Sequence, residues 1–269
     1  MSIILNSSDL SLAPTVGPLV RQGMTFGESL KGLATIGFSS VQLDGTLSGM
    51  RARELSDRDR KDLAATVGRH GMRVAGIDLF IPRIHFNDTA HQDRAMDAFV
   101  QTMSLSADLG RVPVSVAIDA EGVEGDVLKG MLETADRLGV GLAIHGEDKL
   151  KALVGLIEEE DLPMLGCGLD PAAVMAFGGD AVKWVQEHGK VLKVGRLSDL
   201  STVAVEQAGP RRVAAGNQDG GLDVMGYRLG CDMASGRVGP VVLDLRQLEN
   251  GLTGAKIGKA NWEDAAIRL

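Results

Sequence analysis

Short runs of apolar residues recur along the chain, and each is long enough to form one buried strand. Longer segments lie between them, in which apolar residues recur every three or four positions, as they do on one face of a helix. An eighth strand near the N-terminus has to be sought in residues 2–6 or 14–20. The pattern therefore predicts strands that alternate with helices. The seven clear runs are residues 38–45, 73–80, 112–119, 140–147, 163–170, 191–199 and 239–247.

The expected helices carry signals for their ends. Ser56 is placed to cap one helix, and Gly71 can end it in the left-handed conformation. A second helix is expected to follow Asp170, with Pro171 in its first turn, and to end before Gly189. The other two segments with clear helical spacing are residues 91–110 and 122–139.

Alternation of strands and helices requires parallel strands, because each helix returns the chain to the same end of the sheet. Continuously apolar runs are typical of strands that are covered on both faces. No G-x-G-x-x-G sequence follows the first strand, and no linker rich in proline, glycine or serine divides the chain. We therefore predict a single (β/α)8 TIM barrel that spans residues 1–269, a length usual for this fold.

Composition restricts the partners. The net charge of −8 argues against nucleic acid and anionic membranes, and an aromatic content of 3% leaves few platforms for stacked bases. No apolar run approaches the roughly 18 residues of a membrane span, and the N-terminus lacks the basic region of a secretory signal. We expect a cytoplasmic protein in which Cys167 and Cys231 are buried reduced thiols. The sequence leaves the oligomeric state open.

Every predicted strand end carries a polar or ionisable residue. In a TIM barrel these ends converge on one mouth, where the active site lies. Singly, each residue has a structural alternative: Asp170 can be a helix cap, and Asp44 or Asp119 can begin a turn. As a ring they predict a polar pocket. The ring comprises Gln42, Asp44, Asp78, Asp119, His145, Glu147, Asp170, Arg196, Asp199 and Asp244.

Three further features bear on the mouth. Residues 209–223 form a glycine-rich segment with Arg211 and Arg212, which could bind an anion through backbone N–H groups or could equally be a flexible polar loop. Asp219 and Asp223 would oppose an anion if they pointed inward. The remaining candidates are two histidines expected to end helices on the surface, His70 and His188, and a pair expected on a loop that reaches the mouth, Arg83 and His85.

The order and spacing of several segments resemble the xylose isomerase-like TIM barrels, a family of sugar phosphate isomerases and epimerases with endonuclease IV as a distant relative. The most specific parts are SADLG before a strand, and the glycine-rich loop followed by GPVVLD. The resemblance covers about residues 26–250, and it implies the same barrel. The matching segments are residues 29–45, 63–79, 93–110, 166–170, 194–200 and 215–244.

The resemblance also implies a metal site, with changes. Members of the family typically hold a divalent metal with two glutamates, an aspartate and a histidine, and two carboxylates move a proton between adjacent carbons. A guanidinium in place of the histidine stays protonated and cannot bind a cation. The corresponding positions here are His145 for the first glutamate, Asp170 for the aspartate, Arg196 for the histidine, with Asp199 three residues later, Asp244 for the last glutamate and Gln42 for a glutamate of the second strand.

Arg196 has two expected roles. It either forms an internal salt bridge with Asp170, Asp199 or Asp244 in place of a metal, or it binds the carboxylate, phosphate or developing oxyanion of a substrate. If a metal (Mn, Zn, Co or Mg) is bound, the ligands would be His145, Asp170 and Asp244, with Arg196 turned away.

Two hypotheses for function follow. The first is an isomerase or epimerase for a small sugar or sugar acid, with or without a metal; the second is a barrel that has lost catalysis and binds a ligand or partner. Cleavage of phosphodiesters is disfavoured, because only one of five histidines lies at a strand end. The first assigns catalysis to His145, Asp170 and Asp244, and substrate binding to Gln42, Asp78, His85, Arg196 and Asp199.

Overall fold

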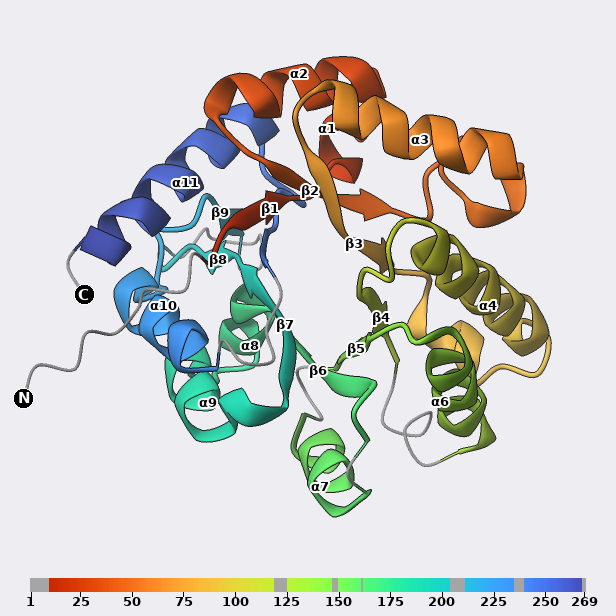
Figure 1. Ribbon diagram of the computed structural model, residues 1–269. Coiled ribbons are helices and arrows are strands. Elements are labelled where there is room, and N and C mark those ends of the chain that lie inside the picture. The colour runs from red at the N-terminus through yellow and green to blue at the C-terminus, as the bar shows by residue number, and fades with distance from the viewer. Residues whose placement is uncertain are drawn as a thin grey trace, which may run out of the picture.

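A computed structural model describes residues 10–118, 125–146, 150–160, 162–203, 211–234 and 240–267. Within these residues, eight parallel strands form a barrel wall, and helices surround it (Figure 1). A parallel bridge between Thr15 and Gln42 joins the first and last strands of the sheet. In the order of the sheet the strands are β1 (Leu12–Pro14), β10 (Val241–Leu243), β7 (Leu192–Leu197), β6 (Leu165–Leu169), β5 (Leu142–His145), β4 (Val114–Ala117), β3 (Arg73–Leu79) and β2 (Ser40–Asp44).

The predicted TIM barrel and its seven clear strands are confirmed. The eighth strand, β1, shares only Pro14 with the segment 14–20, most of which forms α1 (Gly17–Arg21). Residues 2–6, the other candidate, lie outside the described residues. The sequence did not identify β1, whose three residues include Pro14, because proline lacks the N–H group of a regular strand residue.

The helices form the outer layer (Figure 1). Ser56 caps α3 as predicted, and Gly71 takes a φ of 71° just beyond its end. The segment between Asp170 and Gly189 is two helices rather than one, because Gly178 adopts a φ of 74° and Asp180 caps a new start. The helices after α1 are α2 (Phe26–Ile36), α3 (Asp57–Arg69), α4 (Gln92–Asp108), α6 (Asp126–Leu138), α7 (Leu150–Glu160), α8 (Pro171–Ala176), α9 (Ala181–His188), α10 (Val224–Met233) and α11 (Gly251–Ile267).

Short elements complete the chain. The 3₁₀ helices are η1 (Ala52–Glu54), η2 (Arg83–Phe86) and η3 (Gly189–Val191). An antiparallel pair, β8 (Asp199–Leu200) and β9 (Arg212–Val213), follows the carboxyl end of β7.

The core has two parts. The larger one lies between the barrel wall and the helices. A smaller cluster of Ala143, Val194 and Val242, one residue each from β5, β7 and β10, is separate from it. Because these buried residues are separate from the core between the wall and the helices, we place this cluster inside the barrel. These small and branched residues form the layer directly below the polar residues at the strand ends.

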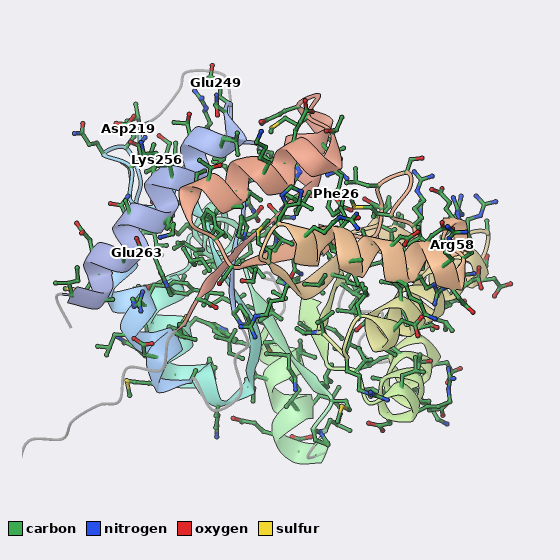
Figure 2. All side chains as sticks on the ribbon, turned by 45° about the horizontal axis from the view of Figure 1, so that its top comes forward. Phe26, Arg58, Asp219, Glu249, Lys256 and Glu263 are labelled. Atoms are coloured by element: carbon green, nitrogen blue, oxygen red, sulfur yellow. The ribbon has the colours of Figure 1, made fainter. Side chains whose placement is uncertain are left out.

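The two cysteines are free and buried, as predicted. Burial raises the pKa of both thiols to about 12, so both stay protonated at neutral pH. On the outside, Arg58 on α3 and Lys256 and Glu263 on α11 point away from the barrel (Figure 2). No helix in the described part of the chain is both long and apolar enough to cross a membrane.

Candidate functional site

Three polar residues at the ends of β5, β7 and β10 face the barrel axis, as the three residues of the small cluster below them do. Side chains alternate along a strand, so the residues two positions beyond Ala143, Val194 and Val242 point the same way. Those residues are His145, Arg196 and Asp244. All three are less than 5% exposed.

Arg196 is fully buried, and acidic side chains surround it. Its Nη1 and Nη2 each donate a 2.9 Å hydrogen bond to Asp78, one to each carboxylate oxygen, and its Nε donates to Asp244 at 3.2 Å. Gln42 donates a further bond to Asp78 at 2.9 Å. Paired geometry of this kind offsets the cost of burying a guanidinium. The first of the two expected roles, an internal salt bridge, therefore describes Arg196, but two of its bonds go to Asp78 rather than to Asp170 or Asp199.

Two more arginines cover the other carboxylates. Arg212, on β9, donates to Asp170 and, at 3.1 Å, to Asp244. Arg246, two residues beyond Asp244, donates to Asp170 at 2.7 Å and to both oxygens of Asp244. We call the six residues the arginine–aspartate cluster: Asp78, Asp170, Arg196, Arg212, Asp244 and Arg246. Three guanidinium groups and three carboxylates leave it formally neutral.

The arginines set the protonation of the carboxylates. Burial by itself would raise the pKa of Asp170 and Asp244, but the charges of Arg212 and Arg246 hold the pKa of Asp170 below its ordinary value. Arg246 and Arg196 hold that of Asp244 well below it. Burial would also lower the pKa of Arg196, and Asp78 and Asp244 outweigh that effect. Both carboxylates are thus ionised at neutral pH and are weak bases.

His145 lies beside the cluster. Its ring makes an edge-to-face contact with Phe80, with the ring centroids 5.3 Å apart. The other side of the ring packs on Gly168, where a Cβ would fall 2.1 Å from Nε2. The same Phe80 lies under two arginines, at 5.1 Å from Arg196 and 4.7 Å from Arg246. Phe80 therefore connects the imidazole to the cluster.

Asp199 is buried but belongs to the loop rather than to the cluster. Its carboxylate accepts hydrogen bonds from the backbone N–H groups of Leu200, Gly216, Gly221 and Leu222, at 2.8 to 3.1 Å. Gly216, Gly221 and Leu222 of the glycine-rich loop thus bind the protein's own Asp199, and binding of a ligand anion by this loop stays a prediction. Contact between Asp199 and a substrate remains a prediction.

The other candidates are dispersed. Asp44 is bound by Arg21 at 2.7 Å, and Asp223 caps α10. Arg211 pairs with Glu249 on the surface, and Asp219 is exposed at the edge of the loop (Figure 2). His70 and His188 end α3 and α9. Asp119 and Glu147 lie outside the described residues.

The metal ligands expected from the resemblance do not fit a cation here. Asp170 and Asp244 do meet, but the oxygens that a metal would need accept hydrogen bonds from Arg212 and Arg246. Because the three guanidinium groups neutralise the three carboxylates, no net negative charge remains here to bind a divalent ion. Among the described residues, no group of three or more histidine, cysteine, aspartate or glutamate side chains is arranged to hold a metal.

Sequence reasoning missed the partners that complete the cluster. Arg246 could have been found from the spacing in LDLR, because residues two apart beyond a strand point to the same side. Ser198 donates a 2.6 Å hydrogen bond to Asp170, and the apolar run around it gave no signal of this. Arg212 was noted only as a neighbour of the glycine-rich loop, and its contacts depend on how β8 pairs with β9.

A cavity of about 570 Å³ opens beside the cluster, at the carboxyl ends of β1, β6, β7 and β10. Arg21, Arg212 and Arg246 line it, and no aspartate or glutamate does so in the part of the chain that the structure describes. In the described part of the chain, Nε of Arg212 and Nη1 of Arg246 have no hydrogen-bond acceptor, so both can still donate. The other residues that line it are Pro18, Gln22, Ala172, Ala173, Ala176, Phe177, Leu200, Gln247 and Leu248.

Comparisons with known proteins identify the fold. The chain is similar to a xylose isomerase-like TIM barrel protein from Mycobacterium smegmatis in complex with magnesium, with a TM-score of 0.73 and 11% identity over 97% of this chain and 98% of that one. It is also similar to the IOLI protein with a zinc atom, with a TM-score of 0.72 and 15% identity over 96% and 98%. A third similar structure is a 3-keto-D-glucoside 4-epimerase from E. coli, with a TM-score of 0.66 and 10% identity over 95% and 100%.

The fold of the chain is thus that of the xylose isomerase-like TIM barrels, as the resemblance in the sequence implied. No family model matches the sequence, and no curated protein matches it either. Identities of 10 to 15% carry the architecture and not the chemistry.

Proposed function

We propose that this protein binds a small anionic carbohydrate, a sugar acid or a phosphorylated sugar, at the barrel mouth and isomerises or epimerises it by proton transfer. The observation that carries the proposal is the cavity of about 570 Å³, whose described lining residues include three arginines and no carboxylate. Similar folds include a D-psicose 3-epimerase crystallised in the presence of D-fructose, and this supports a carbohydrate as the ligand.

The arginines have the chemistry that such a ligand needs. A guanidinium presents five N–H donors in a fixed plane and matches carboxylate and phosphate oxygens. Asp170 and Asp244 hold Arg212 and Arg246 in place, so their unused donors are oriented before the ligand arrives. The same donors would stabilise the oxyanion that develops when a proton leaves the carbon next to a carbonyl.

Proton transfer is assigned to His145. The arginines hold Asp170 and Asp244 in their weakly basic, ionised form, which leaves His145, against Phe80 beside the cluster, as the group for the proton. The proposal therefore moves the substrate-binding role from Arg196 to Arg212 and Arg246. Asp170 and Asp244 become positioning residues. No step in the proposal requires a metal.

Matched ligands test the anion requirement. D-fructose 6-phosphate and D-fructose differ by the phosphate, and D-gluconate and D-glucose differ in oxidation of one carbon to a carboxylate. We expect the charged member of at least one pair to raise the melting temperature and the neutral member to leave it unchanged. The variant Arg246→Met should abolish the shift, while Arg211→Met, an exposed arginine paired with Glu249, should keep it. Equal shifts from charged and neutral members would contradict the anion site.

Exchange of solvent deuterium into the carbon-bound hydrogens of the ligand tests the chemistry. NMR should show exchange with the unaltered protein. The variant His145→Gln should lose exchange while it keeps the melting shift. Binding without exchange in the unaltered protein would refute the catalytic part and leave the second hypothesis, a barrel that only binds a ligand.

A further inference from the structure

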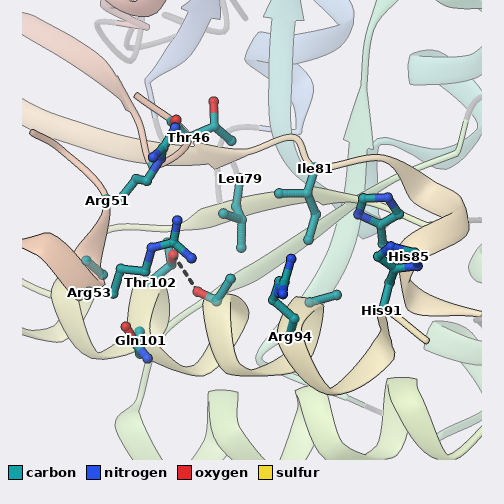
Figure 3. Close-up of a pocket in the computed structure, with 14 residues that line it drawn as sticks. Thr46, Arg51, Arg53, Leu79, Ile81, His85, His91, Arg94, Gln101 and Thr102 are labelled. Carbon is teal, nitrogen blue, oxygen red and sulfur yellow. Dashed lines mark hydrogen bonds between the residues drawn. The ribbon is translucent and has the colours of Figure 1, made fainter. Parts of the chain in front are cut away.

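A second cavity lies outside the barrel mouth, between the carboxyl ends of β2 and β3 and the helix α4 (Figure 3). Its volume is about 240 Å³, below the range usual for drug-sized ligands. It shares no lining residue with the cavity at the mouth. Its lining residues are Gly45, Thr46, Arg51, Ala52, Arg53, Leu79, Ile81, His85, His91, Arg94, Ala95, Ala98, Gln101 and Thr102.

Basic side chains gather in this second cavity. Arg51 and Arg53 come from η1 and the residue before it, and Arg94 comes from the first turn of α4. No aspartate or glutamate is among the described residues that line it, although the chain as a whole carries a net charge of −8. Arg51 donates to Glu54 at 3.0 Å, but neither Arg53 nor Arg94 forms an ion pair in the described part of the chain. Such a local excess of positive charge attracts small anions.

Two histidines complete the polar side. His85, which the sequence placed at the barrel mouth, instead stacks on His91 with the ring centroids 4.6 Å apart. His91 is held by Asp88, with Nδ1 2.6 Å from the carboxylate. Figure 3 shows Arg53 and Arg94 over α4 and the two rings at one end of the cavity. The histidines thus extend the row of N–H groups that begins with the arginines.

Apolar side chains line the second cavity as well. Leu79 is the last residue of β3, Ile81 lies two residues beyond it, and Ala95 and Ala98 belong to α4. Thr102 lies deeper, where its hydroxyl donates to the carbonyl of Ala98 at 2.7 Å. A ligand with a short carbon skeleton and a doubly charged head group would satisfy both sides.

The end of β3 separates the second cavity from the mouth. Successive side chains point to opposite faces there. Asp78 belongs to the arginine–aspartate cluster and Phe80 contacts it, while Leu79 and Ile81 line the second cavity. Two sites on opposite faces of one strand end can be occupied at the same time. A ligand in the second cavity is therefore not the substrate bound at the mouth.

From these observations we infer that Arg53, Arg94 and the residues around them form a second binding site for a small organic dianion, of the phosphate monoester or dicarboxylate class. The site is independent of the one proposed at the mouth.

Calorimetric titration of the full chain tests this inference. The probes are glycerol 3-phosphate, succinate, inorganic phosphate and, as a neutral control, glycerol. We expect at least one dianion to bind saturably and glycerol not to bind. Binding of glycerol 3-phosphate but not of succinate would identify the ligand class as a phosphate monoester. Binding of succinate but not of glycerol 3-phosphate would identify it as a dicarboxylate. Absence of saturable binding by every dianion up to about 10 mM would overturn the inference.

Paired variants locate the site. Arg53→Gln with Arg94→Gln should weaken binding at least about tenfold, the effect of roughly 1.4 kcal/mol. The control, Arg58→Gln with Lys256→Gln, removes the same charge from exposed positions outside the second cavity, and it should change affinity less than about twofold. If both pairs of variants weaken binding of the dianion equally, the effect comes from overall charge, and the inference is overturned.

The variant Arg246→Met separates the two sites. Because Arg246 lines only the mouth, this variant should leave binding of the dianion in the second cavity unchanged. If Arg246→Met abolishes binding and the Arg53–Arg94 pair does not affect it, the dianion binds at the mouth alone. That result would overturn the second site and would support the proposed function.

Discussion

Replacement of Arg196 by methionine tests whether the arginine–aspartate cluster is an electrostatic unit. Methionine has a similar length and no charge, so the change removes the donors with little loss of volume. Asp78 would keep only its hydrogen bond from Gln42, at 2.9 Å, and would be a buried carboxylate without a counter-ion. Asp244 would keep Arg212 and Arg246.

The expected cost follows from these contacts. Removal of one partner from a buried ion pair costs about 3–5 kcal/mol, because the remaining charge stays buried. Arg196 is fully buried and loses three hydrogen bonds, which places it within this range. At about 2–4 °C per kcal/mol for a chain of this size, the melting temperature should fall on the order of 10 °C.

The assay is a double-mutant cycle in which the stability of each variant is measured by urea denaturation and thermal melting. The second variant, Asp78→Asn, removes the orphaned charge but can still accept a hydrogen bond from Gln42. The double variant should therefore be more stable than Arg196→Met alone, by roughly 1–3 kcal/mol. An exposed control, Arg58→Met, should stay within about 0.5 kcal/mol of the unaltered protein.

Two results would refute the reasoning. If Arg196→Met costs less than about 1 kcal/mol, the guanidinium does not neutralise Asp78 in solution. If the double variant is no more stable than the single one, the loss comes from packing and not from an unpaired charge.

Three other predictions concern the loop, the carboxylates and metals. Gly220→Ala should destabilise the protein by about 1–3 kcal/mol, because a Cβ there would fall 2.0 Å from Oδ2 of Asp199. Gly155→Ala, a control with open space around the residue inside α7, should stabilise the protein by about 1 kcal/mol in the same denaturation assay. The lowered pKa values of Asp170 and Asp244 add stability that is complete above their ordinary value of 3.8 and is lost as the pH falls toward the lowered values. Urea midpoints measured from pH 7 to 2 should therefore lose this contribution only below about pH 4. Loss of the contribution between pH 7 and 5 would contradict the assignment. Dialysis against a chelator, or addition of Mn²⁺ or Zn²⁺, should move the melting temperature by less than about 1 °C, since arginines occupy the two carboxylates; a stabilising shift saturating at one metal per chain would contradict this.

The barrel could be predicted because its signal is local and repeated. Seven strands lie in largely apolar runs of eight or nine residues that are visible in the sequence, as the amphipathic helices are, and the parallel arrangement follows from their alternation. The same reasoning failed at β1, a short strand that includes Pro14, and at Gly178, where one expected helix divides into α8 and α9. In both places the deciding feature is a few residues long, and the surrounding structure determines it.

The candidate site was predicted in part. That Arg196 needs a carboxylate followed from the cost of burying its charge, and this requirement holds in the structure. The identity of the partner did not follow, because Asp78 is 118 residues away, and the register of several strands sets which carboxylate it meets. His85 and Asp199 show the same limit: one lies in the second cavity, and the other binds the backbone of its own loop.

The sequence by itself determined the barrel, the mouth and the kinds of groups that stand there, since those depend on hydrophobic period and on the cost of burying charge. Only the tertiary structure decided that Arg212 and Arg246 cover the carboxylates that a metal would need and that arginines gather in two separate cavities. The physical reason is that a pairing energy depends on distances of 3 to 4 Å between residues far apart in the chain. Those distances exist only once the helices and strands have packed.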